Sequence, residues 1–185
     1  MLKIGVIIGS TRDQRVSTQV ADWVMSFTED RTDAEFEVVD IKDYEFEEFN
    51  TIPPGFHNRE YDDEVVIKWS KKIDELDGFI FITPEYNKSI TPSLKNAIDH
   101  IGPEWANKAA GSVSYGSTLG VASTLALRQI LGNLNVAVVA PFGALSMFTD
   151  FKEMSEFQPG DYHNESIENT IDQVVLWAKA LKTIR

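Results

Sequence analysis

Two arginines lie in the loop that follows the first apolar segment of the chain. The stretch GSTRDQRVS, residues 9–17, comes directly after an apolar run and precedes the periodicity of a helix. Gly9 allows a tight turn and Ser10 offers a hydroxyl group. Arg12 and Arg15 are unexpected there, because the amino-terminal end of a helix dipole disfavours cations. A phosphate group between the two guanidinium groups would remove this conflict.

Two interpretations of this loop are open. In the first, free backbone N–H groups near Val16 and Ser17 join the arginines in a phosphate site. In the second, the arginines pair with acidic neighbours in a solvated loop. The spacing matches neither GxxxxGK(S/T) nor GxGxxG, so the nucleoside-triphosphate and dinucleotide fingerprints are both absent.

A second loop, TPEYNKSITP at 83–92, also follows an apolar run. Pro84 lacks an N–H group and stiffens the turn. This would leave the N–H groups of Glu85, Tyr86 and Asn87 free to face a ligand. The Tyr86 ring could also pack against a flat group. Taken alone, the stretch also fits an ordinary turn between a strand and a helix.

A third loop, SYGSTLG at 114–120, places small and hydroxyl-bearing residues around Tyr115. Small residues allow a planar group to approach the backbone closely. Taken alone, this loop is uninformative too.

The elements that must position these loops alternate between strands and helices. Short apolar runs predict five strands, and amphipathic periods predict helices between and after them. The predicted strands cover residues 4–8, 35–40, 78–83, 110–115 and 136–140. Thr91 before Pro92 is typical of a helix N-cap, and residues 146–165 are expected to form a polar loop before the last helix.

This alternation predicts an α/β fold, a parallel sheet with helices on both faces, in one domain over residues 1–185. Such sheets bind ligands at the carboxyl ends of their strands. All three loops follow predicted strands, so they are expected to meet at that edge.

The composition excludes several other kinds of site. The chain has a net charge of −12, which argues against nucleic acid or an anionic membrane surface as a partner. It has no cysteine and three widely separated histidines, so no metal site or thiolate nucleophile is expected. The apolar start is too short for a signal segment or a membrane span, and a cytoplasmic location is expected.

Three segments together resemble the NADPH-dependent FMN reductase family. They are GSTR before a helix, PEYN followed by SITPSLKNAIDH, and SYG before a helix that carries LRQIL. The resemblance spans nearly the whole chain, in family order and at family spacing. It implies a flavodoxin-like three-layer sandwich with a five-stranded parallel sheet, and FMN as the cofactor.

The resemblance also assigns cofactor contacts loop by loop. The first loop would hold the FMN phosphate, the second would contact the isoalloxazine ring, and the third would flank the ring. A terminal phosphate with about two negative charges suits an arginine better than the diphosphate of FAD would. Family members often have serine in place of Arg15 and asparagine in place of Ser17. The implied contacts are Ser10, Arg12, Arg15, Val16, Ser17, Pro84, Glu85, Tyr86, Asn87, Ser114, Tyr115, Gly116 and Ser117.

The implied reaction has two steps. NADPH or NADH would give a hydride to the flavin, and a small-molecule acceptor such as a quinone, an azo compound or free flavin would then use the same face. No catalytic residue is assigned, because the sequence has no Ser/His/Asp, Cys/His or paired-carboxylate constellation. A homodimer or homotetramer is expected, since family members are commonly dimers or tetramers.

Two alternatives to an enzyme remain, namely a flavodoxin-like electron carrier and a flavin-binding module that signals redox state without turnover. The role of residues 50–61 is also open. This loop contains Pro53-Pro54-Gly55 and could be a lid that brings Phe56 or His57 over the site, or a passive surface excursion.

Overall fold

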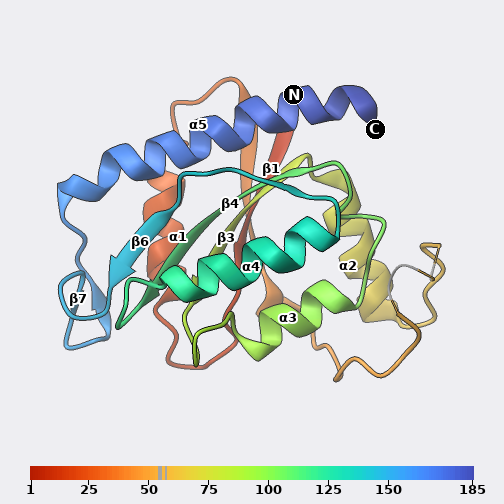
Figure 1. Cartoon of the computed structure of the whole chain (residues 1–185), viewed down its shortest axis with the longest axis horizontal. Coiled ribbons are helices and arrows are strands. Elements are labelled where there is room, and N and C mark those ends of the chain that lie inside the picture. Colours follow the sequence, from red (N-terminus) through yellow and green to blue (C-terminus); the bar gives the residue numbers. More distant parts are fainter. Residues whose placement is uncertain (54–55, 57) are drawn as a thin grey trace.

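The strands form a parallel sheet in the computed structural model, which describes residues 1–53, 56 and 58–185 (Figure 1). Their order across the sheet is β2-β1-β3-β4-β5, which is the flavodoxin-like order. The predicted fold class is therefore confirmed. The bounds are β1 Leu2–Ile8, β2 Ala34–Asp40, β3 Gly78–Pro84, β4 Ala109–Gly116 and β5 Ala137–Val138.

The last strand position is filled by two short segments, where the sequence predicted one continuous strand. β5 pairs with the start of β4, and β6 (Gly143–Ser146) pairs with its end. Between them, Arg128 donates hydrogen bonds to the carbonyls of Val139 (3.1 Å) and Ala140 (2.6 Å). Pro141 then follows and has no N–H group for the ladder. The predicted strand 136–140 was therefore wrong in its extent.

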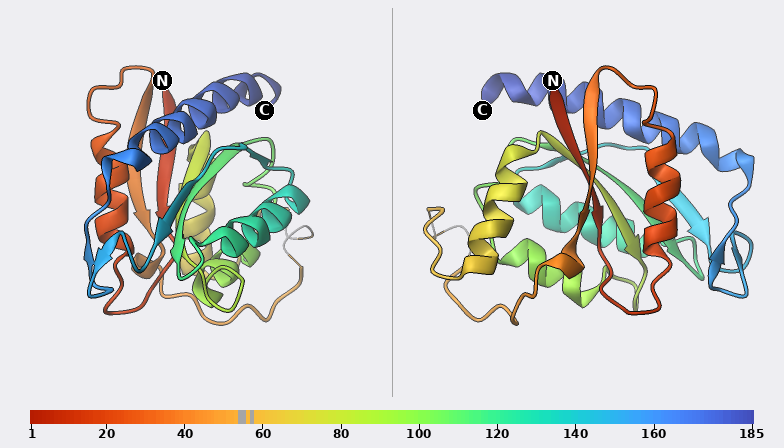
Figure 2. Two further views of the ribbon diagram at one scale, coloured as in Figure 1. Left: turned by 60° about the vertical axis from the view of Figure 1, so that its left-hand side comes forward. Right: turned by 180° about the vertical axis from the view of Figure 1, so that it is seen from behind.

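Helices cover both faces of the sheet (Figures 1 and 2). α1 (Ser17–Ser26) and α5 (Asn164–Leu181) pack on one face. α2 (Glu64–Glu75), α3 (Pro92–Asp99) and α4 (Val121–Asn133) pack on the other. Among the described residues, no helix is both long and apolar enough to cross a membrane.

The apolar runs of the sequence become the core because each strand is covered on both sides. All seven residues of β3 are buried, as expected for a central parallel strand. On the face of α2, α3 and α4, the fully buried rings are Trp69, Phe79, Phe81 and Trp105. Each such side chain contributes about 1.5–3 kcal/mol of burial energy.

The predicted N-cap at the start of α3 is confirmed. The Thr91 side chain accepts a hydrogen bond from the N–H group of Leu94 at 3.0 Å, and Pro92 is the first helical residue. This cap fixes the end of the second loop.

The region between β6 and α5 contains a small hairpin that was not predicted. β7 (Phe151–Lys152) and β8 (Glu156–Phe157) pair antiparallel, and a 3₁₀ turn over Asp161–His163 leads into α5. Strands of two residues are too short to show alternation in a sequence, so this stretch could only be expected to form a polar loop. The hairpin lies beside α1 (Figure 2).

Candidate functional site

The three loops meet at the carboxyl edge of the sheet, as predicted, because β1, β3 and β4 are neighbours. They enclose a pocket of about 220 Å³. Ten of the residues predicted to contact the cofactor line it. The full lining is Ser10, Arg12, Gln14, Arg15, Val16, Pro84, Glu85, Tyr86, Tyr115, Gly116, Ser117, Met147 and Met154.

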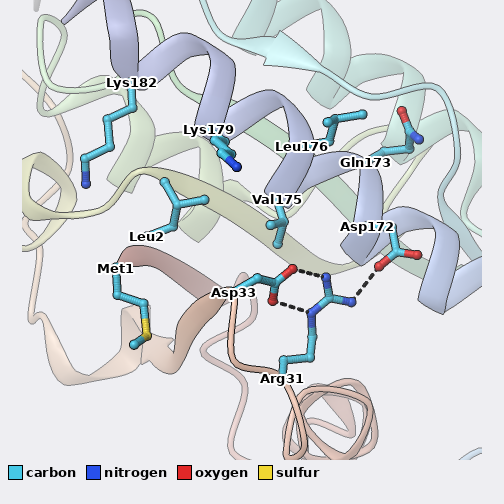
Figure 3. A pocket seen from close by; sticks show the side chains of 10 residues that line it. All are labelled: Met1, Leu2, Arg31, Asp33, Asp172, Gln173, Val175, Leu176, Lys179 and Lys182. Atoms are coloured by element: carbon cyan, nitrogen blue, oxygen red, sulfur yellow. Dashed lines mark hydrogen bonds and ion pairs between the residues drawn. The ribbon is translucent and has the colours of Figure 1, made fainter.

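A larger hollow of about 710 Å³ lies at the opposite edge, between the start of β1 and α5 (Figure 3). Arg31, one of the cations that line it, already contacts Asp33 at 2.7 Å and Asp172 at 2.5 Å. None of the residues predicted for the site lines this hollow. The smaller pocket is therefore the better candidate, since residues suited to binding an anion converge there.

Gly9 lets the first loop approach the second. A Cβ atom at this position would lie 2.8 Å from Leu94 Cδ2 and 3.0 Å from the Ile82 carbonyl oxygen. The Gly9 N–H group donates to that same carbonyl at 2.8 Å, and the Thr91 hydroxyl donates to the Gly9 carbonyl. Any larger residue at position 9 would press against β3 and α3, between which the second loop runs.

Arg15 is committed to the protein itself. It contacts both carboxylate oxygens of Asp40, at 2.7 Å for Oδ1, and donates to the Ser10 carbonyl at 2.7 Å. The side chains of Arg15 and Asp40 are only 12% and 16% exposed. Pairing with an acidic neighbour, the second interpretation of the loop, thus describes Arg15. The pair ties the loop to the end of β2, and a direct phosphate contact by Arg15 stays a prediction.

Arg12 has a different environment. It forms no ion pair with any described residue, and its Nη1 donates a hydrogen bond to the Tyr86 hydroxyl at 3.2 Å. This contact raises the pKa of Arg12, so the guanidinium group keeps its charge. An unneutralised cation therefore lies on the pocket wall, between the first and second loops.

The start of α1 also fits an anion. Ser17 is fully buried and does not itself line the pocket; its Oγ atom interacts with the Tyr115 hydroxyl and makes no other hydrogen bond within the described part of the chain. The N-cap residue Val16 gives the helix no side-chain cap, which leaves its first N–H groups without a partner from that source. Phosphate oxygens could satisfy both kinds of group.

The second loop is a tight turn, and one expectation about it was wrong. Asn87 and Lys88 have φ values of 50° and 67°, as a two-residue hairpin turn requires. The Tyr86 N–H group donates to Ser89 at 2.9 Å, and the Glu85 N–H group donates to the Tyr115 carbonyl at 2.8 Å. These two N–H groups are therefore not free for a ligand. Asn87 is exposed and does not line the pocket.

Glu85 joins the second loop to the third. Its Oε1 accepts hydrogen bonds from Lys88 Nζ at 3.2 Å and from the Thr118 hydroxyl at 3.0 Å, and its Oε2 accepts one from the Ala122 N–H group at 3.0 Å. Burial alone would raise the pKa of Glu85, but these donors lower it, so the carboxylate stays ionised. The N-cap residue Gly120 supplies no side-chain cap to α4, and Glu85 does so from another loop.

The third loop is shaped by two glycines and a buried tyrosine. Gly120 has a φ of 67°, and a Cβ atom there would lie 2.6 Å from the Tyr115 nitrogen. At Gly116 a Cβ atom would lie 3.0 Å from Glu85 Cβ. Burial raises the pKa of Tyr115, which keeps its hydroxyl neutral. Ser114 lies below the pocket, where its hydroxyl is 2.9 Å from that of Thr124.

Three residues that line the pocket were not predicted, namely Gln14, Met147 and Met154. Gln14 belongs to the first loop and could have been included with its neighbours. Met147 follows β6 and Met154 lies at the hairpin tip, so their place depends on two elements that the sequence pattern does not reveal.

Residues 50–61 gain no support as a lid. Pro54, Gly55 and His57 lie outside the described residues, and the described part of this segment does not line the pocket. Just before it, the Phe49 N–H group donates to Asn96 Oδ1 at 2.9 Å, which attaches the chain to α3.

Comparisons with known proteins agree on one family. The model of the NADPH-dependent FMN reductases matches residues 2–150. An NAD(P)H-dependent FMN reductase of Schizosaccharomyces pombe is 34% identical over 151 residues, covering 80% of this chain and 74% of that protein. The NAD(P)H-dependent FMN reductase LOT6 of Saccharomyces cerevisiae is 32% identical over 183 residues, covering 90% of this chain and 93% of that protein. An NAD(P)H:quinone oxidoreductase of Solanum tuberosum is 38% identical over 140 residues, covering 70% of this chain and 67% of that protein.

A solved structure shows the same fold. The flavoenzyme NAD(P)H:(acceptor) oxidoreductase FerB from Paracoccus denitrificans superposes with a TM-score of 0.73 at 18% identity, over 97% of this chain and 98% of that one. The family model covers the strands that carry all three loops, and the relatives extend over most of the chain. This chain therefore belongs to the NADPH-dependent FMN reductase family.

Proposed function

We propose that this chain is a cytoplasmic FMN-dependent oxidoreductase that passes electrons from NADPH or NADH to a small-molecule acceptor such as a quinone. The observation that carries the proposal is the pocket at the carboxyl edge of the sheet, which is lined by Arg12, a cation with no ion-pair partner among the described residues, and by Val16 at the uncapped start of α1. The names of the relatives, FMN reductases and quinone oxidoreductases, support the same chemistry.

The phosphate of FMN would be held by Ser10, Arg12, Ser17 and the N–H groups at the start of α1. Arg12 supplies the charge, and Ser17 supplies a hydroxyl donor that is near the Tyr115 hydroxyl. Such charge-assisted contacts are about twice as strong as neutral hydrogen bonds. Arg15 is not part of this set, because its ion pair with Asp40 holds the loop in shape.

The ring of the flavin would lie between the second and third loops, beside Tyr86, Tyr115 and Gly116. Bound FMN supplies hydride acceptance and electron donation that no side chain of the protein can supply. The chain binds and orients the cofactor: Gly116 leaves room beside the backbone, and Glu85 keeps the two loops in register.

A second copy of the chain would complete the site. The pocket of about 220 Å³ is smaller than the range of about 300–1,000 Å³ that is usual for small-molecule sites. Beside it, the start of α4 exposes Leu119, Val121 and Leu125. An apolar face next to an incomplete pocket favours a homodimer, or a homotetramer built from it, with the two surfaces in contact.

Steady-state kinetics with NADPH and a quinone test the proposed activity. One flavin site must serve donor and acceptor in turn, so the double-reciprocal lines should be parallel. An electron carrier or a redox-sensing module would bind FMN without sustained NADPH oxidation. Intersecting lines would contradict the shared site, and FMN binding without turnover would favour one of those alternatives.

A further inference from the structure

The β7–β8 hairpin forms part of the pocket wall, although it lies beyond the residues that the family model matches. The family model ends at residue 150, and the hairpin begins at Phe151. Met154 at its tip lines the pocket together with Arg12 and Gln14. A segment outside the residues matched by the family model therefore contributes a side chain to the candidate cofactor site.

The hairpin is attached to the first turn of α1. Gln19 Nε2 donates to the Ser155 carbonyl at 3.0 Å, and the Phe157 N–H group donates to Gln19 Oε1 at 2.9 Å. Gln19 comes two residues after Ser17, so these bonds hold the tip close to the start of α1. This is the end of the pocket at which the phosphate is proposed to bind.

Aromatic packing holds the body of the hairpin. Phe157 contacts Phe151 and Trp23, with ring centroids 4.9 Å and 5.3 Å apart. Phe151 in turn contacts the buried Tyr115, at 5.4 Å, below the third loop. The hairpin is thus packed against both α1 and β4.

A buried carboxylate fixes the base of the hairpin. Asp150 accepts hydrogen bonds from the Ser146 N–H group at 2.7 Å, the Tyr162 hydroxyl at 2.9 Å and His163 Nε2 at 3.0 Å. The base, body and tip of the hairpin are thus all attached to the rest of the fold, and the Met154 side chain, which is 57% exposed, lies on the pocket wall that the hairpin forms.

The turn at the tip is unusual for its residues. Glu153 and Met154 have φ values of 51° and 56°, a conformation for which glycine or asparagine is normally chosen. Glycine would adopt it without steric cost, whereas a side chain does not. Position 154 therefore has a methionine side chain on the pocket wall, although the backbone conformation there favours glycine.

We propose that Met154 is a specificity-determining residue that closes the phosphate end of the pocket and restricts the site to a flavin mononucleotide. In FAD, a second phosphate and an adenosine extend from the phosphate that FMN carries at its end. Met154, held beside the start of α1, obstructs that extension. This inference rests on the proposed function, since it concerns the same flavin site.

The test compares Met154→Gly with Glu153→Gly. Glycine suits the left-handed turn at both positions, so we expect each substitution to raise the melting temperature. Measuring the melting temperature of each variant therefore checks that it is folded. Only Met154 lines the pocket, so Glu153→Gly is the matched control. The dissociation constants of FMN and FAD would be measured for the wild type and both variants by quenching of flavin fluorescence.

We expect the ratio of the FAD to the FMN dissociation constant to fall by about tenfold in Met154→Gly, and to stay at the wild-type value in Glu153→Gly. An unchanged ratio in Met154→Gly, or an equal fall in both variants, would overturn the role of Met154 while leaving FMN binding by the wild type intact. If the wild type bound no FMN at all, the proposed function would fail first, so the two failures can be told apart.

Discussion

Arg12 and Arg15 are three residues apart in one loop, yet they have different partners. Arg15 is neutralised by Asp40 in a largely buried pair, whereas the one side-chain hydrogen bond that Arg12 makes among the described residues is to the uncharged Tyr86 hydroxyl. A cation without a carboxylate partner can neutralise a bound phosphate without first breaking an ion pair. We therefore assign the charge recognition of FMN to Arg12.

Replacing Arg12 with alanine should weaken FMN binding far more than riboflavin binding, because only FMN carries a phosphate. The loss of a charge-assisted contact should cost about 1.5–3 kcal/mol, or roughly ten- to a hundredfold in the dissociation constant. Isothermal titration calorimetry with both ligands measures the difference. Lys179→Ala is the control, since Lys179 lines the distant hollow and forms no ion pair among the described residues. Equal losses for FMN and riboflavin would place Arg12 away from the phosphate.

At the scale of the elements, a buried lysine links the end of α2 to the start of β4. Lys108 Nζ donates to the carbonyls of Ile73 at 2.5 Å and Asp74 at 3.0 Å, where α2 ends. Burial lowers the pKa of Lys108 to about 8. These bonds use carbonyl groups that the helix itself cannot satisfy.

The lowered pKa of Lys108 predicts a rise in stability at alkaline pH. Between pH 8 and the ordinary lysine pKa of 10.5, the unfolded chain holds a proton that the folded chain has released. The free energy of unfolding should therefore increase by up to about 3 kcal/mol across this window. Urea unfolding of the wild type and Lys108→Met, at about pH 7 and about pH 10.5, isolates this contribution. The same pH dependence in both proteins would contradict it.

The elements differ in how well their sequences reveal them. The strands β1 and β3 are long and mostly apolar, and β4 is a long run of small and apolar residues that is buried throughout, so the sheet and the three loops at its edge could be predicted. The fifth strand could not be predicted correctly, because its break depends on Arg128 from another helix. The hairpin is held by Gln19 and by packing between distant rings, which no local pattern records.

The candidate site shows the same division. The loops and most of the residues in the pocket follow from chemistry and order along the chain. The sequence does not show whether a side chain is free or paired, because the partner often lies on another segment. Arg15 pairs with Asp40, and Glu85 accepts a hydrogen bond from Thr118. Ser114 was assigned to the site by its place beside Tyr115, yet its hydroxyl turns toward Thr124.

At the scale of the whole molecule, the start of α4 is an exposed apolar surface beside the pocket. Leu125 is 56% exposed there, and Leu176 on α5 is 58% exposed near the opposite edge of the sheet. If a second copy covers α4, Leu125→Glu should weaken association by at least about tenfold, whereas Leu176→Glu should not. Size-exclusion chromatography with light scattering gives the masses. A monomeric wild type, or equal effects of the two substitutions, would contradict a dimer built on α4.

Anaerobic titration of the FMN-loaded protein with NADPH tests the central claim most directly. The visible absorbance of the flavin should bleach with one equivalent of NADPH per site before any acceptor is added, and a quinone added afterwards should restore it. Chromatography of the released cofactor should yield FMN. The account would be contradicted by a protein that binds no FMN at micromolar concentration, or by bound flavin that NADPH cannot reduce until the acceptor is present.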